Sequence, residues 1–464
     1  MAGVELKINA WTGSETPREV IDPSAVAQIE TKKPQLKKDG ILRPSAPADL
    51  NDWADPRVGW GLILADNPDL SPKVKARADD APGPLQQLLA HRKGVVLRWD
   101  RSLKPGYLRR YDGDGGKSDL NIAAGAQGGD RYQLPRYLLL AGGPEVFPWE
   151  VQYRLNLSAF VGRLSLKAEA LERYVAAAVT DWANTGAIER TSPLLWSVDH
   201  GGDDITVILR ALIARPIRQA WERDGDLEGA TMWEGRDATA SRLLEALSRR
   251  PPFVLTTSHG ATGPFQSLRN GSRELGALVD VDYRVSSAAE ILAAWSPRGA
   301  VWYAHACCSA GSDAPSIYAT MFDSGGSIGR MLDEASSLGP GVSPLGEALL
   351  GAEEPLRAFI GHVEPTFDWP LLDPKTGGSL AQAIVDSLYA RLFQPRATVG
   401  AALAPIFDQA GRFFSELDKA RQLAEAGLPD DKAILINRLS ALDRQSLVIL
   451  GDPAVTVPVY SQGS

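Results

Sequence analysis

Two short segments of the chain place reactive side chains at the end of an apolar run. Residues 253–260 read FVLTTSHG, and residues 300–311 read AVWYAHACCSAG. Each apolar run is typical of a buried strand in a parallel sheet. The first run ends at the imidazole of His259, and the second ends at the thiols of Cys307 and Cys308. An imidazole and a thiol can act as base and nucleophile in covalent catalysis.

The carboxyl ends of parallel strands form the ligand crevice of an open α/β sheet. Two neighbouring strands that end in His259 and in the cysteines would therefore bring base and nucleophile to one rim. Small residues around these ends let backbone amides approach a substrate carbonyl, so we expect Gly260 and Cys308 to supply an oxyanion hole. The alternative interpretation is structural, because cysteine is among the most often buried residue types.

Length and charge limit the classes of function. The chain has 464 residues, enough for two or three domains, and a net charge of −8. The acidic excess argues against a nucleic-acid partner. No apolar run is long enough to cross a bilayer and no secretory pattern opens the sequence, so we expect a cytoplasmic protein without a membrane partner. The only two cysteines are adjacent, which excludes a disulfide scaffold.

The order of apolar and helix-like segments predicts the fold class. Short apolar runs alternate with helical patterns, first over residues 57–190 and again from residue 191 to the end. This alternation predicts an α/β protein with two side-by-side αβ subdomains and mainly parallel sheets. We expect the non-catalytic subdomain over 57–190 and the catalytic subdomain over 191–464. Residues 1–56 are rich in proline and are predicted to form an irregular N-terminal arm.

The sequence predicts no metal and no cofactor. Histidine is scarce, and no pair of histidines has the spacing of a metallopeptidase motif. The GGKS run at residues 115–118 lacks the earlier glycine of a phosphate-binding loop, since Tyr111 stands there. The preceding DGDGG run lacks the remaining ligands of a calcium-binding loop.

Taken in order, the segments resemble the caspase-like (clan CD) cysteine peptidases, most closely the gingipain and CHAT branch. The resemblance covers most of residues 135–460 and includes the two strand ends above and the LVILGDP run at residues 447–453. It implies a caspase-like catalytic subdomain and a cysteine endopeptidase with a Cys–His dyad. Protein or peptide would be the substrate.

The resemblance also bears on which cysteine attacks. In the family the nucleophile is usually followed by two residues and then by a glycine or another small residue. Cys308 has this spacing to Gly311 and is the favoured nucleophile. Cys307, which completes an Ala-Cys pair with Ala306, is the alternative.

Many intracellular members of the group cleave after arginine or lysine, which requires a carboxylate in the specificity pocket. The candidate acids near the predicted strand ends are Asp199, Asp203, Asp204 and Asp313. The resemblance further suggests an effector of prokaryotic antiviral defence or cell death, switched on by a protein partner. The alternative is a catalytically silent scaffold or regulatory module that binds a partner along the same crevice.

Overall fold

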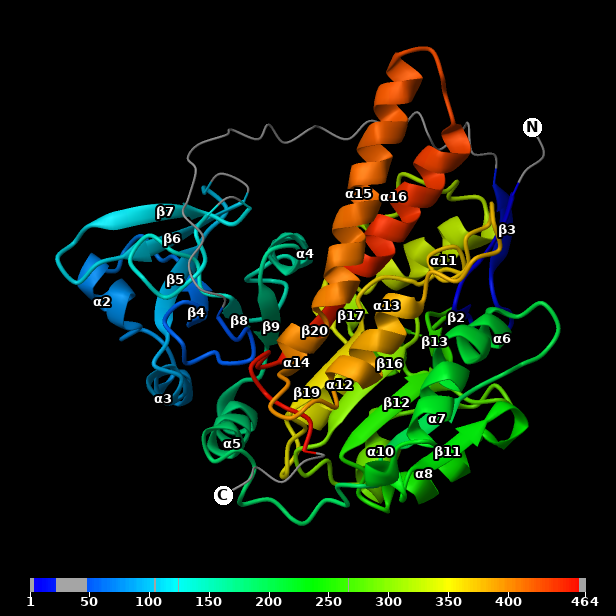
Figure 1. Ribbon diagram of the computed structural model, residues 1–464, viewed down its shortest axis with the longest axis horizontal. Coiled ribbons are helices and arrows are strands. Elements are labelled where there is room, and N and C mark those ends of the chain that lie inside the picture. Colours follow the sequence, from blue (N-terminus) through cyan, green and yellow to red (C-terminus); the bar gives the residue numbers. More distant parts are fainter. Residues whose placement is uncertain (1–3, 22–47, 104–105, 124, 266, 459–464) are drawn as a thin grey trace.

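One twelve-stranded sheet runs through the molecule (Figure 1). The computed structural model describes residues 4–21, 48–103, 106–123, 125–265 and 267–458. From one edge to the middle, the strands are β11 (Thr231–Glu234), β10 (Leu194–Ser197), β12 (Phe253–Thr257), β16 (Val301–His305), β19 (Ala358–His362) and β20 (Leu447–Gly451). The sheet continues with β9 (Phe160–Leu164), β8 (Tyr137–Ala141), β4 (Trp60–Ala65), β5 (Val95–Trp99), β6 (Tyr107–Tyr111) and β7 (Lys117–Asn121).

The predicted fold class is confirmed. From β11 to β19 all neighbouring strands are parallel, and β20 is antiparallel to β19. All residues of β10, β12, β16, β19 and β20 are buried, which explains their near-continuous apolar sequences. β20 also pairs with β9, so the sheets of the two predicted halves are continuous. The division at residue 190 stays a prediction.

Helices cover both faces of this sheet (Figure 1). In the N-terminal half they are α2 (Pro72–Arg77), α3 (Gly83–His91), α4 (Trp149–Asn156) and α5 (Ala168–Val179). The C-terminal half begins with α6 (Ile205–Leu209), α7 (Arg215–Trp221), α8 (Ala240–Leu247), α9 (Leu268–Glu274), α10 (Ala288–Ala294), α11 (Ser327–Ser336) and α12 (Pro344–Leu350). It ends with α13 (Gln382–Val385), α14 (Val399–Ala402) and the long hairpin of α15 (Ala404–Glu425) and α16 (Asp431–Gln445). No helix within the described ranges has the length and apolar character to cross a bilayer.

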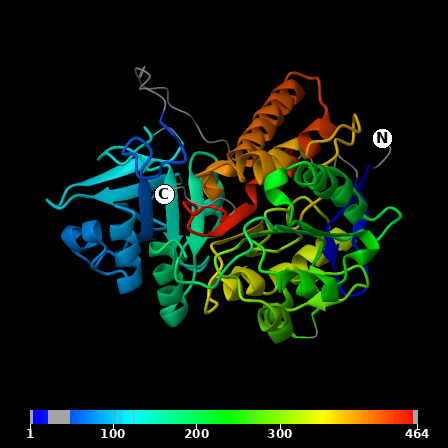
Figure 2. The ribbon, with the colours of Figure 1, turned by 60° about the horizontal axis from the view of Figure 1, so that its bottom comes forward.

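The N-terminal segment differs from its prediction as an irregular arm. Residues 4–21 form β1 (Val4–Lys7), β2 (Ala10–Trp11) and β3 (Arg18–Ile21). These strands lie beside the C-terminal half and away from β6 and β7 (Figures 1 and 2). Leu6, Ile8 and Ala10 are fully buried, and this every-second-residue period is that of a strand. The prolines conceal that short pattern, and residues 22–47 of the predicted arm lie outside the described residues.

β2 is the edge strand of a second, small sheet. Its order is β15 (Val285–Ser286), β14 (Leu278–Val279), β13 (His259–Ala261) and β2. β2 is parallel to β13, with Ala10 opposite Gly260. A separate pair, β17 (Gly311–Ser312) and β18 (Gly341–Val342), follows the segment that contains the cysteines. The N-terminal segment therefore borders the segment that carries His259.

A buried carboxylate joins the two halves of the molecule just after β20. The Trp60 indole donates to Asp452 Oδ1 at 3.1 Å, and Arg92 forms an ion pair with Oδ2 at 2.8 Å. Gly451 has a φ of 107°, which favours glycine, and Pro453 follows the turn. The turn therefore has a structural role, because it positions the carboxylate that Trp60 and Arg92 share.

We expect Asp452→Asn to destabilise the protein by about 3–5 kcal/mol, because it leaves the buried Arg92 guanidinium without its counter-charge. Urea unfolding followed by tryptophan fluorescence measures the loss. Glu245→Gln, which weakens surface pairs of Arg242 and Arg249, is the control and should change stability by no more than about 0.5 kcal/mol. Equal effects of the two substitutions would contradict the role given to Asp452.

Candidate active site

The register of two parallel strands brings the predicted reactive residues to one edge of the sheet. β12 pairs with β16 so that Thr257 lies opposite His305. The amide of Ser258 donates to the carbonyl of His305 at 3.3 Å, which continues the pairing by one residue. His259 and Cys307 each lie two residues beyond the last paired position. The two segments therefore leave the sheet side by side, as the sequence predicts.

The His259 ring is oriented by a carboxylate. Its Nε2 lies 3.0 Å from both carboxylate oxygens of Asp204, so Nε2–H donates to Asp204. Nδ1 is then the nitrogen that can accept a proton, and it has no hydrogen-bond partner among the residues that the structure describes. Asp204 is itself held as the N-cap of α6 by the amide and hydroxyl of Thr206, at 2.8 and 2.5 Å. Asp204, a predicted specificity acid, thus contacts the predicted base.

Burial and this pairing act on the ionisable groups in opposite directions. Burial alone would raise the pKa of Asp204, but its interactions with the neighbouring His200, His259 and Thr206 outweigh that effect and hold the pKa far below the usual range. Burial lowers the pKa of His259, and Asp204 offsets part of that effect. His259 is therefore a neutral base beside an ionised carboxylate.

A stack of rings supports His259 from one side. His200 stacks on His259 with ring centroids 5.1 Å apart, and Tyr283 stacks on His200 at 4.2 Å. The His200 Nε2–H donates to the carbonyl of Asp280 at 3.0 Å, which fixes that ring. No sequence pattern indicates a role for Tyr283, because it belongs to a loop between the short strands β14 and β15.

Three side chains in this group could hold a metal ion. Ligand atoms of His200, Asp204 and His259 lie within 4.8 Å of one another. Their separation in the sequence matches no metallopeptidase motif, so the sequence does not predict that these three side chains come together. The hydrogen bond from His259 to Asp204 already accounts for the closest contact without a metal.

The two neighbouring thiols are buried in different surroundings. Cys307 lies in the apolar cluster that contains Ile8, and its Sγ accepts a hydrogen bond from the amide of Thr366 at 3.2 Å. Cys308 has a left-handed φ of 54° and packs against Leu275 and Ala335. Burial raises the pKa of both thiols above the ordinary value.

Two backbone amides converge on one oxygen beside these residues. The amides of Gly260 and Cys307 donate to the carbonyl of Asn9, at 3.2 and 3.3 Å. A Cβ on Gly260 would lie 2.0 Å from the Cys307 carbonyl oxygen, so only glycine fits there. The predicted pair was Gly260 and Cys308. The Cys308 amide instead donates to the carbonyl of Glu364 at 3.4 Å.

The four predicted specificity acids occupy different environments. Asp199 is paired with Arg210 at 2.8 Å, and Asp204 contacts His259. Asp313 follows β17 and accepts from the amide of Ala314. Only the Asp203 side chain is largely exposed, at 82%, with Lys7 Nζ 4.0 Å away.

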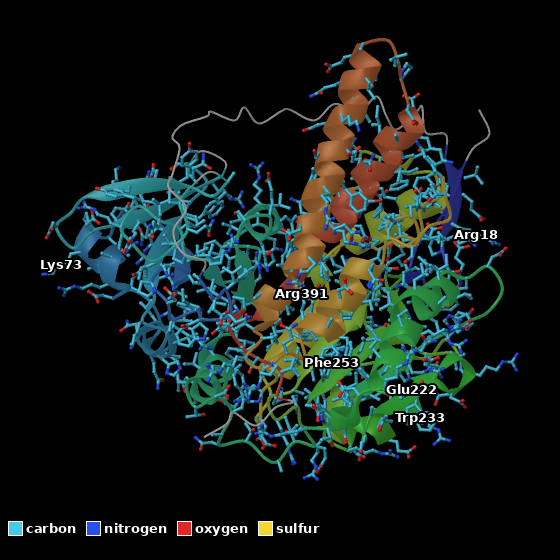
Figure 3. All side chains as sticks on the ribbon, in the orientation of Figure 1. Arg18, Lys73, Glu222, Trp233, Phe253 and Arg391 are labelled. Atoms are coloured by element: carbon cyan, nitrogen blue, oxygen red, sulfur yellow. The ribbon has the colours of Figure 1, made fainter. Side chains whose placement is uncertain are left out.

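Asp203 and Asp204 line a surface cavity of about 640 Å³. Ile205 and Tyr283 line the same cavity, and the N-terminal segment supplies most of the remaining wall. Arg18, one of these wall residues, is labelled in Figure 3 on the opposite side of the view from Lys73. The cavity therefore contains the exposed carboxylate of Asp203 next to Asp204, the residue that contacts His259.

Comparisons with known proteins find likeness in structure and none in sequence. No family model matches the chain, and no curated protein matches its sequence. The complex of pro- and mature domains of Porphyromonas gingivalis RgpB matches at 12% identity and a TM-score of 0.46, over 86% of this chain and 80% of that one. The Arg-specific cysteine proteinase gingipain R (RgpB) matches at 12% identity and a TM-score of 0.41, over 87% and 79%. At these values neither likeness assigns an activity, and the fold class rests on the strand order.

We expect both thiols to react slowly with iodoacetamide in the folded protein, because both are buried and their raised pKa values disfavour the reactive thiolate. Peptide mapping at pH 8 should show labelling at least about a hundredfold slower than in urea, since reaction requires opening of the structure. A native rate close to the rate in urea would contradict the burial of these groups.

Proposed function

We propose that the protein is a cysteine endopeptidase in which Cys307 is the nucleophile and His259 the base. One observation carries the proposal: the amides of Gly260 and Cys307 converge on a single carbonyl oxygen at the edge where His259 lies. Two amide donors that converge on one oxygen are the arrangement that an oxyanion hole requires. Each such donor contributes about 3–4 kcal/mol to transition-state stabilisation in known hydrolases.

The proposed chemistry gives each of these groups one role. His259 Nδ1 takes the proton from the Cys307 thiol while Nε2–H stays bonded to Asp204. The sulfur attacks the peptide carbonyl carbon, and the two amides hold the negative oxygen. His259 then protonates the leaving amine, and water hydrolyses the acyl-enzyme. Asp204 keeps the imidazole in the tautomer that this sequence of steps requires.

The contacts favour Cys307 over Cys308, the reverse of the choice made from spacing. The Cys307 amide is a member of the converging pair, whereas the Cys308 amide is bonded to Glu364. The left-handed backbone at Cys308 places its side chain in a separate apolar cluster with Leu275. Cys308 would then be a packing residue.

The finer parts of the function rest on the family resemblance. We propose that the substrate is a protein or peptide cut after a basic residue, with Asp203 as the acid that binds it. We further propose a cytoplasmic effector of antiviral defence or cell death that a protein partner activates. Asp199 and Asp204 are weaker candidates for the pocket, because each already has a close partner.

A catalytically silent binding module is the second candidate. The burial of both thiols favours it, since neither sulfur in this conformation is accessible to a substrate. The two candidates differ in whether the protein hydrolyses peptides with a thiol nucleophile or does not hydrolyse them at all.

Cys307→Ala and His259→Ala should each lower hydrolysis of a mixed fluorogenic peptide library by several orders of magnitude. The double variant should be little worse than either single variant, because the two groups act as a unit. Cys308→Ala is the matched control and should retain activity within a few-fold. Loss of activity in Cys308→Ala alone would return the nucleophile to Cys308. Retention of activity in both cysteine variants would refute the thiol mechanism, and absence of hydrolysis by the unsubstituted protein would favour the silent module.

Arginine should be preferred over leucine before the cut by roughly ten- to a hundredfold in kcat/KM, because a charge-assisted bond contributes about 1.5–3 kcal/mol. Asp203→Asn should reduce that preference and leave the hydrolysis of neutral peptides unchanged. Fluorogenic peptides that differ only at that position measure both effects. A preference for aspartate or asparagine would contradict the proposed pocket, and Asp313→Asn is the control.

A further inference from the structure

The N-terminal segment passes through the proposed active site as an additional strand. The Asn9 amide donates to the Thr366 carbonyl at 2.9 Å, and Ile8 forms an antiparallel bridge with Phe367. On its other side β2 is parallel to β13, where Ala10 lies opposite Gly260. Residues 7–11 are thus hydrogen-bonded to both walls of the site, which is how an extended peptide binds to an exposed strand edge.

Asn9 occupies the position that a substrate carbonyl needs. Its carbonyl oxygen accepts both converging amides, those of Gly260 and Cys307. Its side-chain Nδ2 donates to the His305 carbonyl at 3.2 Å, and the residue is fully buried. A substrate carbonyl and the Asn9 carbonyl cannot occupy the same pair of donors.

The Asn9 backbone also interacts with both reacting groups. Burial lowers the pKa of His259, and Asp204 and then the Asn9 backbone offset part of that effect. Burial raises the pKa of Cys307, and Thr366 and then the Asn9 backbone offset part of it. This peptide unit contacts the segments of both the base and the nucleophile, since its oxygen accepts the amides of Gly260 and Cys307.

Apolar anchors hold the segment in this place. Leu6 and Ile8 are fully buried in the cluster that also contains Cys307, Tyr318 and Phe367. Because the segment belongs to the same chain, its effective concentration at the site is on the order of millimolar or higher. A free peptide would compete poorly against an occupant of this kind.

We propose that residues 7–11 are an intramolecular peptide ligand of the substrate site, and that the conformation described is a latent one in which this strand excludes substrate. The inference rests on the proposed function, because it takes the site to be one that binds extended peptides. Asn9 carries no basic side chain, so it differs from the residue proposed to precede the cut. The strand would accordingly be bound as an inhibitor and not cleaved as a preferred substrate.

Ile8→Asp in the full chain tests the proposal, since a carboxylate at this buried position should expel the strand. Val20→Asp is the matched control, because Val20 belongs to the same N-terminal segment and is 66% exposed. We expect iodoacetamide labelling of Cys307 to be at least about tenfold faster in Ile8→Asp than in the wild type, because the closed population falls. Val20→Asp should label at the wild-type rate.

A synthetic peptide of residues 5–13 (ELKINAWTG) provides a second test of the proposal. Added to Ile8→Asp, it should restore protection of Cys307, whereas the same peptide with Asn9→Pro should not, because proline lacks the amide that donates to Thr366. Failure of the unmodified peptide to protect would overturn the assignment of residues 7–11 to the site.

Labelling and hydrolysis separate this inference from the proposed function. Faster labelling together with faster peptide hydrolysis supports both, and faster labelling without hydrolysis supports the ligand strand while refuting the peptidase. Unchanged labelling in folded Ile8→Asp, as judged by its thermal transition, overturns the inference. If Ile8→Asp does not fold, Ile8→Ala replaces it under the same criteria, with a smaller expected increase in rate.

Discussion

The parallel register of β12 and β16 is the constraint on which the rest of the site depends. Because Thr257 lies opposite His305, the two chain segments leave the sheet at the same level. A shift of one residue would turn every side chain of one strand to the other face of the sheet. It would also move the amide of Cys307 away from that of Gly260, and the two amides would no longer share an oxygen. The contact of Gly260 with the Cys307 carbonyl shows how little space this register leaves.

Exclusion of water has two opposite consequences at this edge of the sheet. It strengthens the hydrogen bond between His259 and Asp204 and so fixes the orientation of the ring. It also disfavours the thiolate and the imidazolium, since both charged forms lose hydration when they are buried. The same arrangement of side chains is therefore well ordered and unreactive. Removal of the N-terminal strand would admit water to the thiol without moving the strands that position it.

The sequence predicted the elements of the fold and the edge of the sheet better than it predicted individual contacts. Apolar runs such as Phe253–Thr257 and Val301–His305 are long enough and uniform enough to indicate buried parallel strands. The convergence of His259 and the cysteines follows from that assignment alone. The role of Asp204 does not, because its contact with His259 depends on where the N-cap of α6 meets β13. Spacing could not separate the two cysteines, since the left-handed backbone at Cys308 has no signal in the sequence.

The N-terminal segment was mispredicted for a related reason. Its strands are two to four residues long, and the segment as a whole is held by partners that are remote in sequence. β2 pairs with β13, and Ile8 and Asn9 are bonded to Phe367 and Thr366. A pattern of three alternating apolar residues, followed along the chain by several prolines, is too short to indicate a strand without knowledge of those partners. Burial of Leu6 and Ile8 thus depends entirely on tertiary contacts.

The most direct test of the account is to identify the residue that reacts with a mechanism-based inhibitor. Ile8→Asp protein would be treated with a peptidyl acyloxymethyl ketone that carries arginine next to the reactive group, and the adduct would be located by tandem mass spectrometry. The account predicts one adduct, on Cys307. It predicts no adduct when His259→Ala is combined with Ile8→Asp in the same chain. An adduct on Cys308, or no adduct on either cysteine of the folded protein, would contradict it.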